Sequence, residues 1–123
     1  MQRNVKFNYL YRDAGNYKKL AAIIFSNPEG LSIELINKAL RHAFMQDGLF
    51  IAHQIRIPEI FLFTRDDATS DDHCFHEFDA VESTAALPND DYSRSISEFI
   101  REANGEALRG WAAFDPHNRA VPL

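Results

Sequence analysis

The densest group of side chains that could do chemistry lies between Asp71 and Glu82. This stretch reads DDHCFHEFDAVE, so two imidazoles and one thiol stand among five carboxylates. Imidazole and carboxylate groups bind zinc, manganese and non-haem iron, and they also transfer protons in general acid–base catalysis. The segment is therefore the first place to look for a metal site or an active site.

The expected conformation of this segment decides which of its groups can act together. Polar and apolar residues alternate, which predicts a β-strand whose side chains point to opposite faces in turn. His73, Glu77 and Asp79 then share one face and could hold a divalent metal ion, and His76 joins them only if a β-bulge shifts the register. The set has no recognised zinc spacing, and such alternation also marks a strand face exposed to water, so both interpretations stay open. The opposite face would carry Cys74, His76, Phe78, Ala80 and Glu82.

Cys74 is the only cysteine, so no intramolecular disulfide can form. A single cysteine favours a reducing compartment, and we expect a cytoplasmic location. A nucleophilic cysteine needs a nearby base and a lowered pKa, whereas the neighbouring carboxylates would raise the pKa of this thiol. The sequence therefore favours Cys74 as a small, partly buried residue.

The charge is distributed unevenly along the chain. Residues 1–61 carry eight Lys and Arg against five Asp and Glu, whereas residues 62–123 carry five against thirteen. The acidic second half disfavours general nucleic-acid binding, which needs clustered cations to displace counterions from the phosphates. A basic protein partner or a hard metal ion suits it better.

Several functional classes lack their central motif in this chain. It contains no Walker-type phosphate loop, no G-x-G-x-x-G, no G-x-S-x-G and no C-x-x-C pair. It also lacks a leader-like apolar segment and the run of about 20 apolar residues needed to span a bilayer. We therefore expect no nucleoside triphosphatase, dinucleotide oxidoreductase or serine hydrolase activity, and no membrane insertion.

Local patterns in the first half predict a β-hairpin followed by a helix. Alternating polar and apolar residues indicate a strand, residues that tolerate tight backbone geometry indicate a turn, and an N-cap residue before helically spaced apolar residues indicates a helix. The expected elements are strands at 5–12 and 20–25, a turn at 13–16, and a helix that Ser32 caps, begins at Ile33 and closes at Asp47–Gly48.

The second half predicts the same order of elements. A short β-type run precedes the Asp71 to Glu82 stretch, and a capping box precedes apolar residues at helical spacing. The expected elements are a hairpin of strands 59–63 and 71–82, a helix capped by Ser95 and Glu98 that ends near Asn104–Gly105, and an irregular segment at 49–57.

These elements predict an α+β fold with the order ββαββα. An antiparallel sheet with both helices on one face is a stable two-layer arrangement, and residues 1–123 suit a single domain. Residues 106–123 form a C-terminal tail in this scheme. Trp111 and Phe114 are expected to dock on the core, and residues 117–123 to fray.

The tip of the first hairpin is the second candidate site, as a binding surface. Tyr and Arg are enriched among the residues that dominate protein interfaces, which favours Arg12, Tyr17 and Lys18 as contacts. The segment FNYLYRDAGNYK, residues 7–18, resembles the opening of a family of small uncharacterised bacterial proteins, and the later HEF, residues 76–78, resembles its second landmark. The resemblance extends to about Ile100 and implies a bacterial, cytoplasmic protein, without catalytic roles to carry over.

The sequence favours a protein-binding module without catalytic activity, such as a regulator, an antitoxin-like factor or a complex subunit. Such a module needs no cofactor, and its partner would be another protein. The alternative is a metal-dependent hydrolase, acting on phosphodiesters for example, that uses a divalent ion at His73, Glu77 and Asp79 with help from His76. A third possibility is small-ligand binding in an aromatic pocket between sheet and helices. The oligomeric state does not follow from the sequence.

Overall fold

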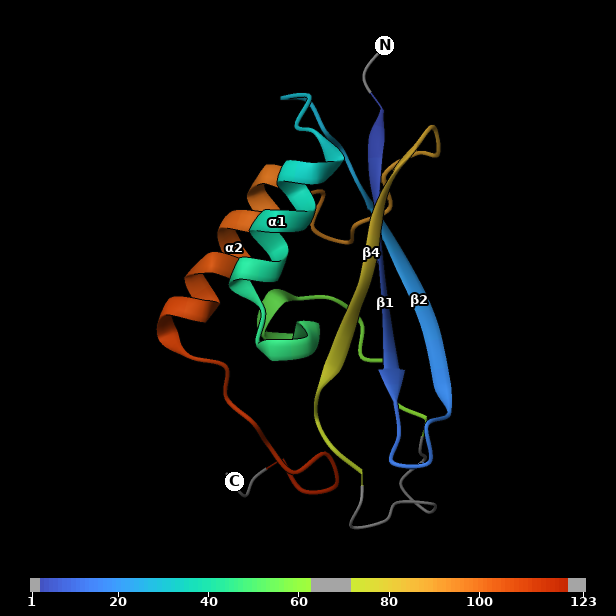
Figure 1. Ribbon diagram of the computed structural model, residues 1–123, viewed down its shortest axis with the longest axis vertical. Coiled ribbons are helices and arrows are strands. Elements are labelled where there is room, and N and C mark those ends of the chain that lie inside the picture. Colours follow the sequence, from blue (N-terminus) through green and yellow to red (C-terminus); the bar gives the residue numbers. More distant parts are fainter. Residues whose placement is uncertain (1–2, 63–71, 120–123) are drawn as a thin grey trace.

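The computed structural model describes residues 3–62 and 72–119. It shows an α+β architecture, in which a curled four-stranded antiparallel sheet of order β2-β1-β4-β3 packs against two helices (Figure 1). The α+β class is confirmed. The elements are β1 (Asn4–Arg12), β2 (Lys18–Phe25), α1 (Ile33–Ala43), the 3-10 turn η1 (Gln46–Gly48), β3 (Leu49–Phe50), the 3-10 turn η2 (Ala52–Ile55), β4 (His76–Thr84) and α2 (Ile96–Arg109).

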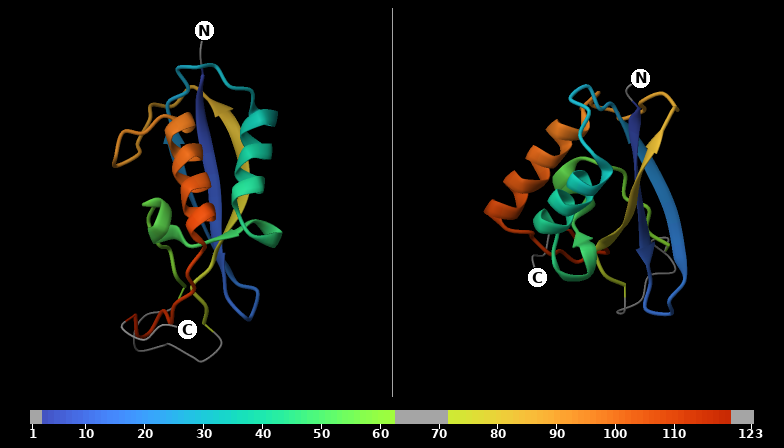
Figure 2. Two further views of the ribbon diagram at one scale, coloured as in Figure 1. Left: turned by 90° about the vertical axis from the view of Figure 1, so that its left-hand side faces the viewer. Right: turned by 45° about the horizontal axis from the view of Figure 1, so that its top comes forward.

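The core lies between the sheet and the helices, which both cover the same face (Figure 2). Phe7 of β1 sits at its centre, because it stacks on Phe78 of β4 at 5.4 Å between ring centroids and meets Phe99 of α2 edge-on at 5.1 Å. Ile36 and Leu40 line the buried side of α1. Burying each of these large side chains stabilises the fold by roughly 1.5 to 3 kcal/mol.

Three local signals of the sequence are confirmed. β1 pairs with β2 from Val5 opposite Phe25 to the turn, which establishes the first hairpin. Ser32 accepts a hydrogen bond from the third backbone N–H of α1, at 3.2 Å. Ser95 and Glu98 form the reciprocal capping box at the start of α2. Each signal depends on residues close together in the chain, so each could be recognised without knowing the fold.

The helix ends differ from those predicted. α1 stops at Ala43, because Phe44 leaves the helix with extended backbone and turns its ring into the core. α2 continues past Gly105 to Arg109 and ends at Gly110, whose φ of 103° only glycine adopts readily. The expected tail at 106–123 therefore begins four residues later, at Gly110.

The predicted strand at 59–63 is wrong for its described residues, 59–62, and Phe63 lies outside the described part. The N–H of Ile60 donates to the ring of His76 rather than to a strand ladder, at 2.9 Å. β4 pairs instead with β1 along its length, and with the two-residue strand β3, Leu49–Phe50, in a segment predicted to be irregular. The strand that pairs with the second side of β4 is thus β3 rather than residues 59–63, and it is much shorter than the predicted partner.

A β-bulge in β4 changes which of its residues share a face. Asn8 pairs with Ala80 but the next residue, Tyr9, pairs with Phe78, so Asp79 is an extra residue opposite β1. The alternation of inward and outward side chains therefore reverses after Phe78. Ala80 and Glu82 were predicted to share a face with Phe78, and this prediction is wrong. The buried residues of β4 are His76, Phe78 and Val81.

The segment after α2 packs on the core as predicted. The indole N–H of Trp111 donates to the carbonyl of Ala43 at 3.1 Å, and Phe114 is buried beside Cys74. Arg119, the last described residue, forms an ion pair with Glu59. The end of the expected fraying segment, 120–123, lies outside the described residues. No helix among the described residues is long and apolar enough to cross a bilayer.

Candidate functional site

His73, the first predicted metal ligand, has both ring nitrogens engaged. It lies in the segment before β4, where its Nδ1 accepts the N–H of Phe75 at 3.1 Å. The proton assigned to the other nitrogen, Nε2, is then donated to the carbonyl of Arg12 at 2.7 Å. A neutral imidazole in this arrangement has no lone pair left for a metal ion.

The other three predicted ligands point to different surroundings. Glu77 is held by the guanidinium of Arg12 at 3.1 and 3.3 Å, and Asp79 stands exposed on the bulge. His76 is fully buried on the core side, where its Nε2 accepts the N–H of Ile60. Among the described residues, no three His, Cys, Asp or Glu side chains come together to hold a metal ion. His73 and Glu77 line one pocket, but Asp79 and His76 do not join them there.

His76 is instead a neutral core residue. The rings of Tyr9, Tyr11, Phe50 and Phe61 surround it at centroid distances of 5.0 to 6.3 Å. Burial lowers its pKa to about 4, and this outweighs the opposing effect of the Cys74 carbonyl. Its Nδ1 makes no hydrogen bond of good geometry with the described residues.

Cys74 is buried rather than partly buried. Its sulfur accepts the N–H of Phe114 at 3.4 Å, and desolvation raises the pKa of the thiol. A raised pKa disfavours the reactive thiolate. The surroundings therefore match a packing role, in line with the preference drawn from the sequence.

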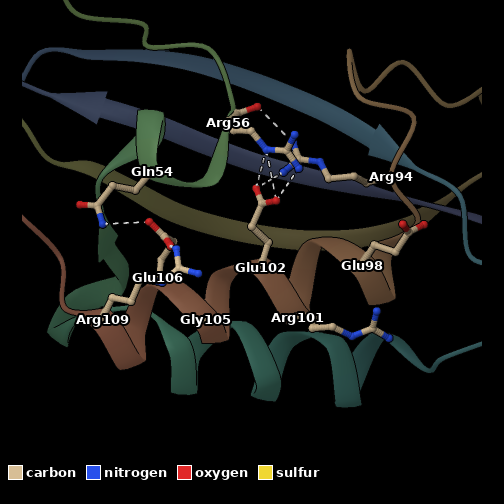
Figure 3. Close-up of a pocket in the computed structure, with 9 residues that line it drawn as sticks. All are labelled: Gln54, Arg56, Arg94, Glu98, Arg101, Glu102, Gly105, Glu106 and Arg109. Carbon is tan, nitrogen blue, oxygen red and sulfur yellow. Dashed lines mark hydrogen bonds and ion pairs between the residues drawn. The ribbon is translucent and has the colours of Figure 1, made fainter.

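A cavity of about 510 Å³ runs along α2 and is lined mainly by charged residues (Figure 3). At its inner wall Arg94, whose side chain is 4% exposed, holds Asp90 through two hydrogen bonds of 2.9 Å. It also donates to the carbonyls of Ile55 and Arg56 and to Glu102, at 2.6 to 3.1 Å. All five N–H groups of the guanidinium are thereby satisfied. Burial raises the pKa of Asp90, but the hydrogen bonds from Arg94 outweigh it and lower the pKa overall.

Most of the other charged residues that line this cavity also form ion pairs or hydrogen bonds with one another. Arg56 binds Glu102, and Arg109 together with Gln54 binds Glu106 (Figure 3). We call the group formed by Arg94, Asp90, Glu102 and Arg56 the Arg94 cluster. Because its donors and acceptors serve one another, it holds η2 and the loop before α2 against the helix, and it offers little to an external ligand.

The tip of the first hairpin is rigidly built. Asp13 accepts the N–H of Tyr17 on its side chain at 2.9 Å, and its own N–H donates to the Tyr17 carbonyl at 3.0 Å. Asn16 adopts a left-handed φ of 66°, which Asn tolerates better than most residues. Its side chain accepts from Arg12, which also holds Glu77. Arg12, one of the three predicted contact residues, is thus committed to the turn.

The next four residues face solvent. Tyr17 and Leu20 are 74% and 70% exposed, and Lys18 and Lys19 between them are exposed too. Neither lysine forms an ion pair with a residue in the described ranges. Of the predicted contacts, Tyr17 and Lys18 are therefore available to a partner. The sequence reasoning missed Lys19 and Leu20, although both follow directly on the residues that it singled out.

β2 is an outer strand, and part of its outer edge is not paired with any residue in the described ranges. Ile24 points its backbone groups away from β1, since its N–H donates to the Asn89 side chain at 2.8 Å and its carbonyl accepts the Asn89 N–H at 3.0 Å. Backbone groups alternate in direction along a strand, so those of Ala22, Leu20 and Lys18 point the same way. No hydrogen bond from another described residue reaches these three.

Comparison with known proteins assigns this chain to no group. No protein-family model matches it. Searches of the curated proteins and of the solved structures also give no match. The resemblance of residues 7–18 and 76–78 to a family of small bacterial proteins stays an expectation.

Proposed function

We propose that this chain is a small protein-binding module without catalytic activity, which contacts its partner through the tip of the first hairpin and the start of β2. Such a module would act as a regulator, an antitoxin-like factor or a complex subunit, in the cytoplasm. The observation that carries the proposal is the contiguous exposure of an aromatic, two cationic and one aliphatic side chain, Tyr17 to Leu20, on a rigid turn.

The energetics of binding favour this surface over others on the molecule. A turn that is already held by Asp13, Asn16 and Arg12 loses little backbone entropy when a partner binds. Tyr supplies a large contact area with few rotatable bonds and a hydroxyl for hydrogen bonding, which explains its enrichment at interfaces. By contrast, a ligand in the cavity beside α2 would compete with ion pairs that are already formed.

Quantitative affinity capture from the source organism tests the proposal. The tagged chain is compared with Tyr17→Ala/Lys18→Glu, which removes the ring and reverses one charge at the hairpin. We expect co-purifying protein to fall about tenfold or more, since truncating a central interface residue costs about 2 kcal/mol or more. The measurement is label-free mass spectrometry of the eluates at low salt.

A matched control variant carries the same two kinds of change elsewhere. Leu108→Ala/Lys38→Glu alters an apolar residue that is 90% exposed and an exposed lysine, both on the helices. It should retain the partner at the level of the unaltered chain. The proposal is overturned if the unaltered chain retains no specific protein, or if the control loses as much as the hairpin variant.

A further inference from the structure

We propose that β2 binds an acidic, extended segment of the partner protein as an additional strand, so that the sheet grows by one strand beyond β2. This inference rests on the proposed function and specifies how the hairpin holds its partner. It would place the new strand at the outer edge of the sheet, on the side away from β1 (Figure 1).

The backbone of β2 supplies the pairing groups. The outward N–H and carbonyl groups of Lys18, Leu20 and Ala22 have no hydrogen-bond partner among the described residues. On an antiparallel or parallel strand, each such residue exchanges hydrogen bonds with the incoming chain. Three consecutive outward residues give a ladder with up to six hydrogen bonds.

The same edge already binds chain in this manner further along. Asn89 occupies the position of a paired residue beside Ile24, with bonds of 2.8 and 3.0 Å. Ser26 then accepts the N–H of Ile96 at 2.8 Å, and it forms a parallel bridge with Ser95. The edge from Ile24 to Ser26 is thus covered by the chain itself, whereas no described residue pairs with the edge from Lys18 to Ala22.

The side chains of the outward residues give an incoming strand an apolar surface. Leu20, Ala22 and Ile24 lie on the sheet face turned away from the helices, since the alternate residues Ile23 and Phe25 are buried in the core. Leu20 stands opposite Leu10 of β1 in the register. Every second side chain of a strand added here can extend this surface.

The charges at the open end favour an acidic partner over a second copy of this chain. Lys6 and Arg12 of the neighbouring strand are matched by Glu82 and Glu77, whereas Lys18 and Lys19 have no acidic partner in the described part of the chain. A carboxylate-bearing strand would neutralise them. Pairing two β2 edges would instead gather four lysines, and edge lysines are a known means of preventing such self-association.

The probe is a ten-residue peptide of alternating Glu and Val, compared with the same peptide carrying Lys in place of Glu. Amide hydrogen exchange of the full chain is followed residue by residue by NMR. We expect the Glu peptide to slow exchange of the Leu20 and Ala22 amides about tenfold or more at saturation, and 0.5 M salt to weaken its binding. The Lys peptide should leave both amides unprotected.

Ala22→Pro isolates the backbone contribution. Proline at this position removes an outward N–H and spares the ladder with β1, which suits an edge strand. We expect peptide binding to weaken about tenfold, while Ala22→Ser, which keeps the N–H, binds as the unaltered chain does. Should Ala22→Pro fail to fold, Lys18→Glu/Lys19→Glu replaces it and should abolish the preference for the Glu peptide.

Three results overturn the inference. They are absence of protection by the Glu peptide at millimolar concentration, equal protection by the Lys peptide, and undiminished binding by a folded Ala22→Pro variant. Concentration-dependent protection of Leu20 and Ala22 without peptide would show a second copy on the edge and would also overturn it. If affinity capture still shows hairpin-dependent partner retention, the proposed function survives and only strand addition is rejected.

Discussion

The Arg94 cluster and the open end of β2 both concentrate cationic side chains, but they differ in whether these cations have partners within the chain. Arg94 is buried and donates all five N–H groups of its guanidinium to acceptors of its own chain. Lys18 and Lys19 are exposed and have no acidic partner in the described ranges. The difference separates a scaffold from the proposed recognition surface, because an internally paired charge stabilises the fold and an unpaired one is available to another molecule.

The largest expected effect comes from breaking the scaffold. Arg94→Ala removes the guanidinium from the carbonyls of Ile55 and Arg56 and from the buried carboxylate of Asp90, which keeps the backbone N–H of residue 94 as a donor. Removing one partner of a buried ion pair typically costs about 3 to 5 kcal/mol of unfolding free energy. Urea denaturation measures the loss. The control is Arg101→Ala, an exposed arginine of α2, which should change stability by less than about 0.5 kcal/mol. A loss below about 1 kcal/mol for Arg94→Ala would contradict the comparison.

Acid should destabilise the fold through the buried histidine of β4, His76. His76 has a pKa of about 4 in the folded chain against 6.5 unfolded, so the unfolded chain binds more protons between these values. The contribution of neutral His76 to the unfolding free energy is complete above about pH 7. About 3 kcal/mol of it is lost as the pH falls towards 4. Denaturation at several pH values measures the slope.

Two variants separate His76 from the carboxylates that titrate in the same range. His76→Gln keeps an acceptor for the Ile60 N–H but does not titrate, so its stability should vary less between pH 7 and pH 4. His42→Gln alters an exposed histidine of α1 and should keep the full slope. Parallel pH profiles for His76→Gln and the unaltered chain would refute this origin of the acid sensitivity.

A smaller effect, and a gain in stability rather than a loss, is expected from substituting Gly105, which lines the cavity beside α2. Gly105 lies inside α2, and a Cβ added there meets no atom within 4 Å. Gly105→Ala should therefore stabilise the fold by about 0.5 to 1 kcal/mol, because alanine loses less backbone entropy in a helix. Thermal unfolding detects this as a rise of a few degrees. Gly110→Ala provides the contrast, since its φ of 103° should make it destabilising.

The smallest effect on stability is expected at the proposed recognition surface. Lys18→Gln/Lys19→Gln removes two exposed charges without an internal partner, so the unfolding free energy should change by less than about 0.5 kcal/mol. Urea denaturation checks this prediction. A loss comparable to that of Arg94→Ala would show that these lysines belong to the scaffold, and the contrast between the two regions would collapse.

The parts of the fold that could be predicted from the sequence are those with local causes. The first hairpin and the caps at Ser32 and Ser95 depend on residues within a few positions of one another. The strand expected at 59–63 was wrong at its described residues because tertiary packing overrode a β-type composition, and the Ile60 N–H is used by a distant side chain.

The candidate site could be predicted only in part, for the same reason. Tyr17 and Lys18 were predicted from their residue types at a turn; their exposure is shown, and their role as contacts stays a prediction. The open edge beside them depends on β4 taking the other side of β1, which no local pattern indicates. The metal hypothesis rested on suitable ligand types, but His73 donates to the carbonyl of Arg12 and accepts the N–H of Phe75, and the bulge at Asp79 changes which residues of β4 share a face.

The position of β1 between β2 and β4 affects the order in which the sheet can form during synthesis. Its second neighbour, β4, begins about 50 residues after β2 ends, so a ribosome making roughly 5 to 20 residues per second completes the first hairpin several seconds earlier. During that interval β1 also lacks its partner, and the nascent hairpin has two open edges rather than one. The lysines at the end of β2 would then repel neighbouring nascent copies.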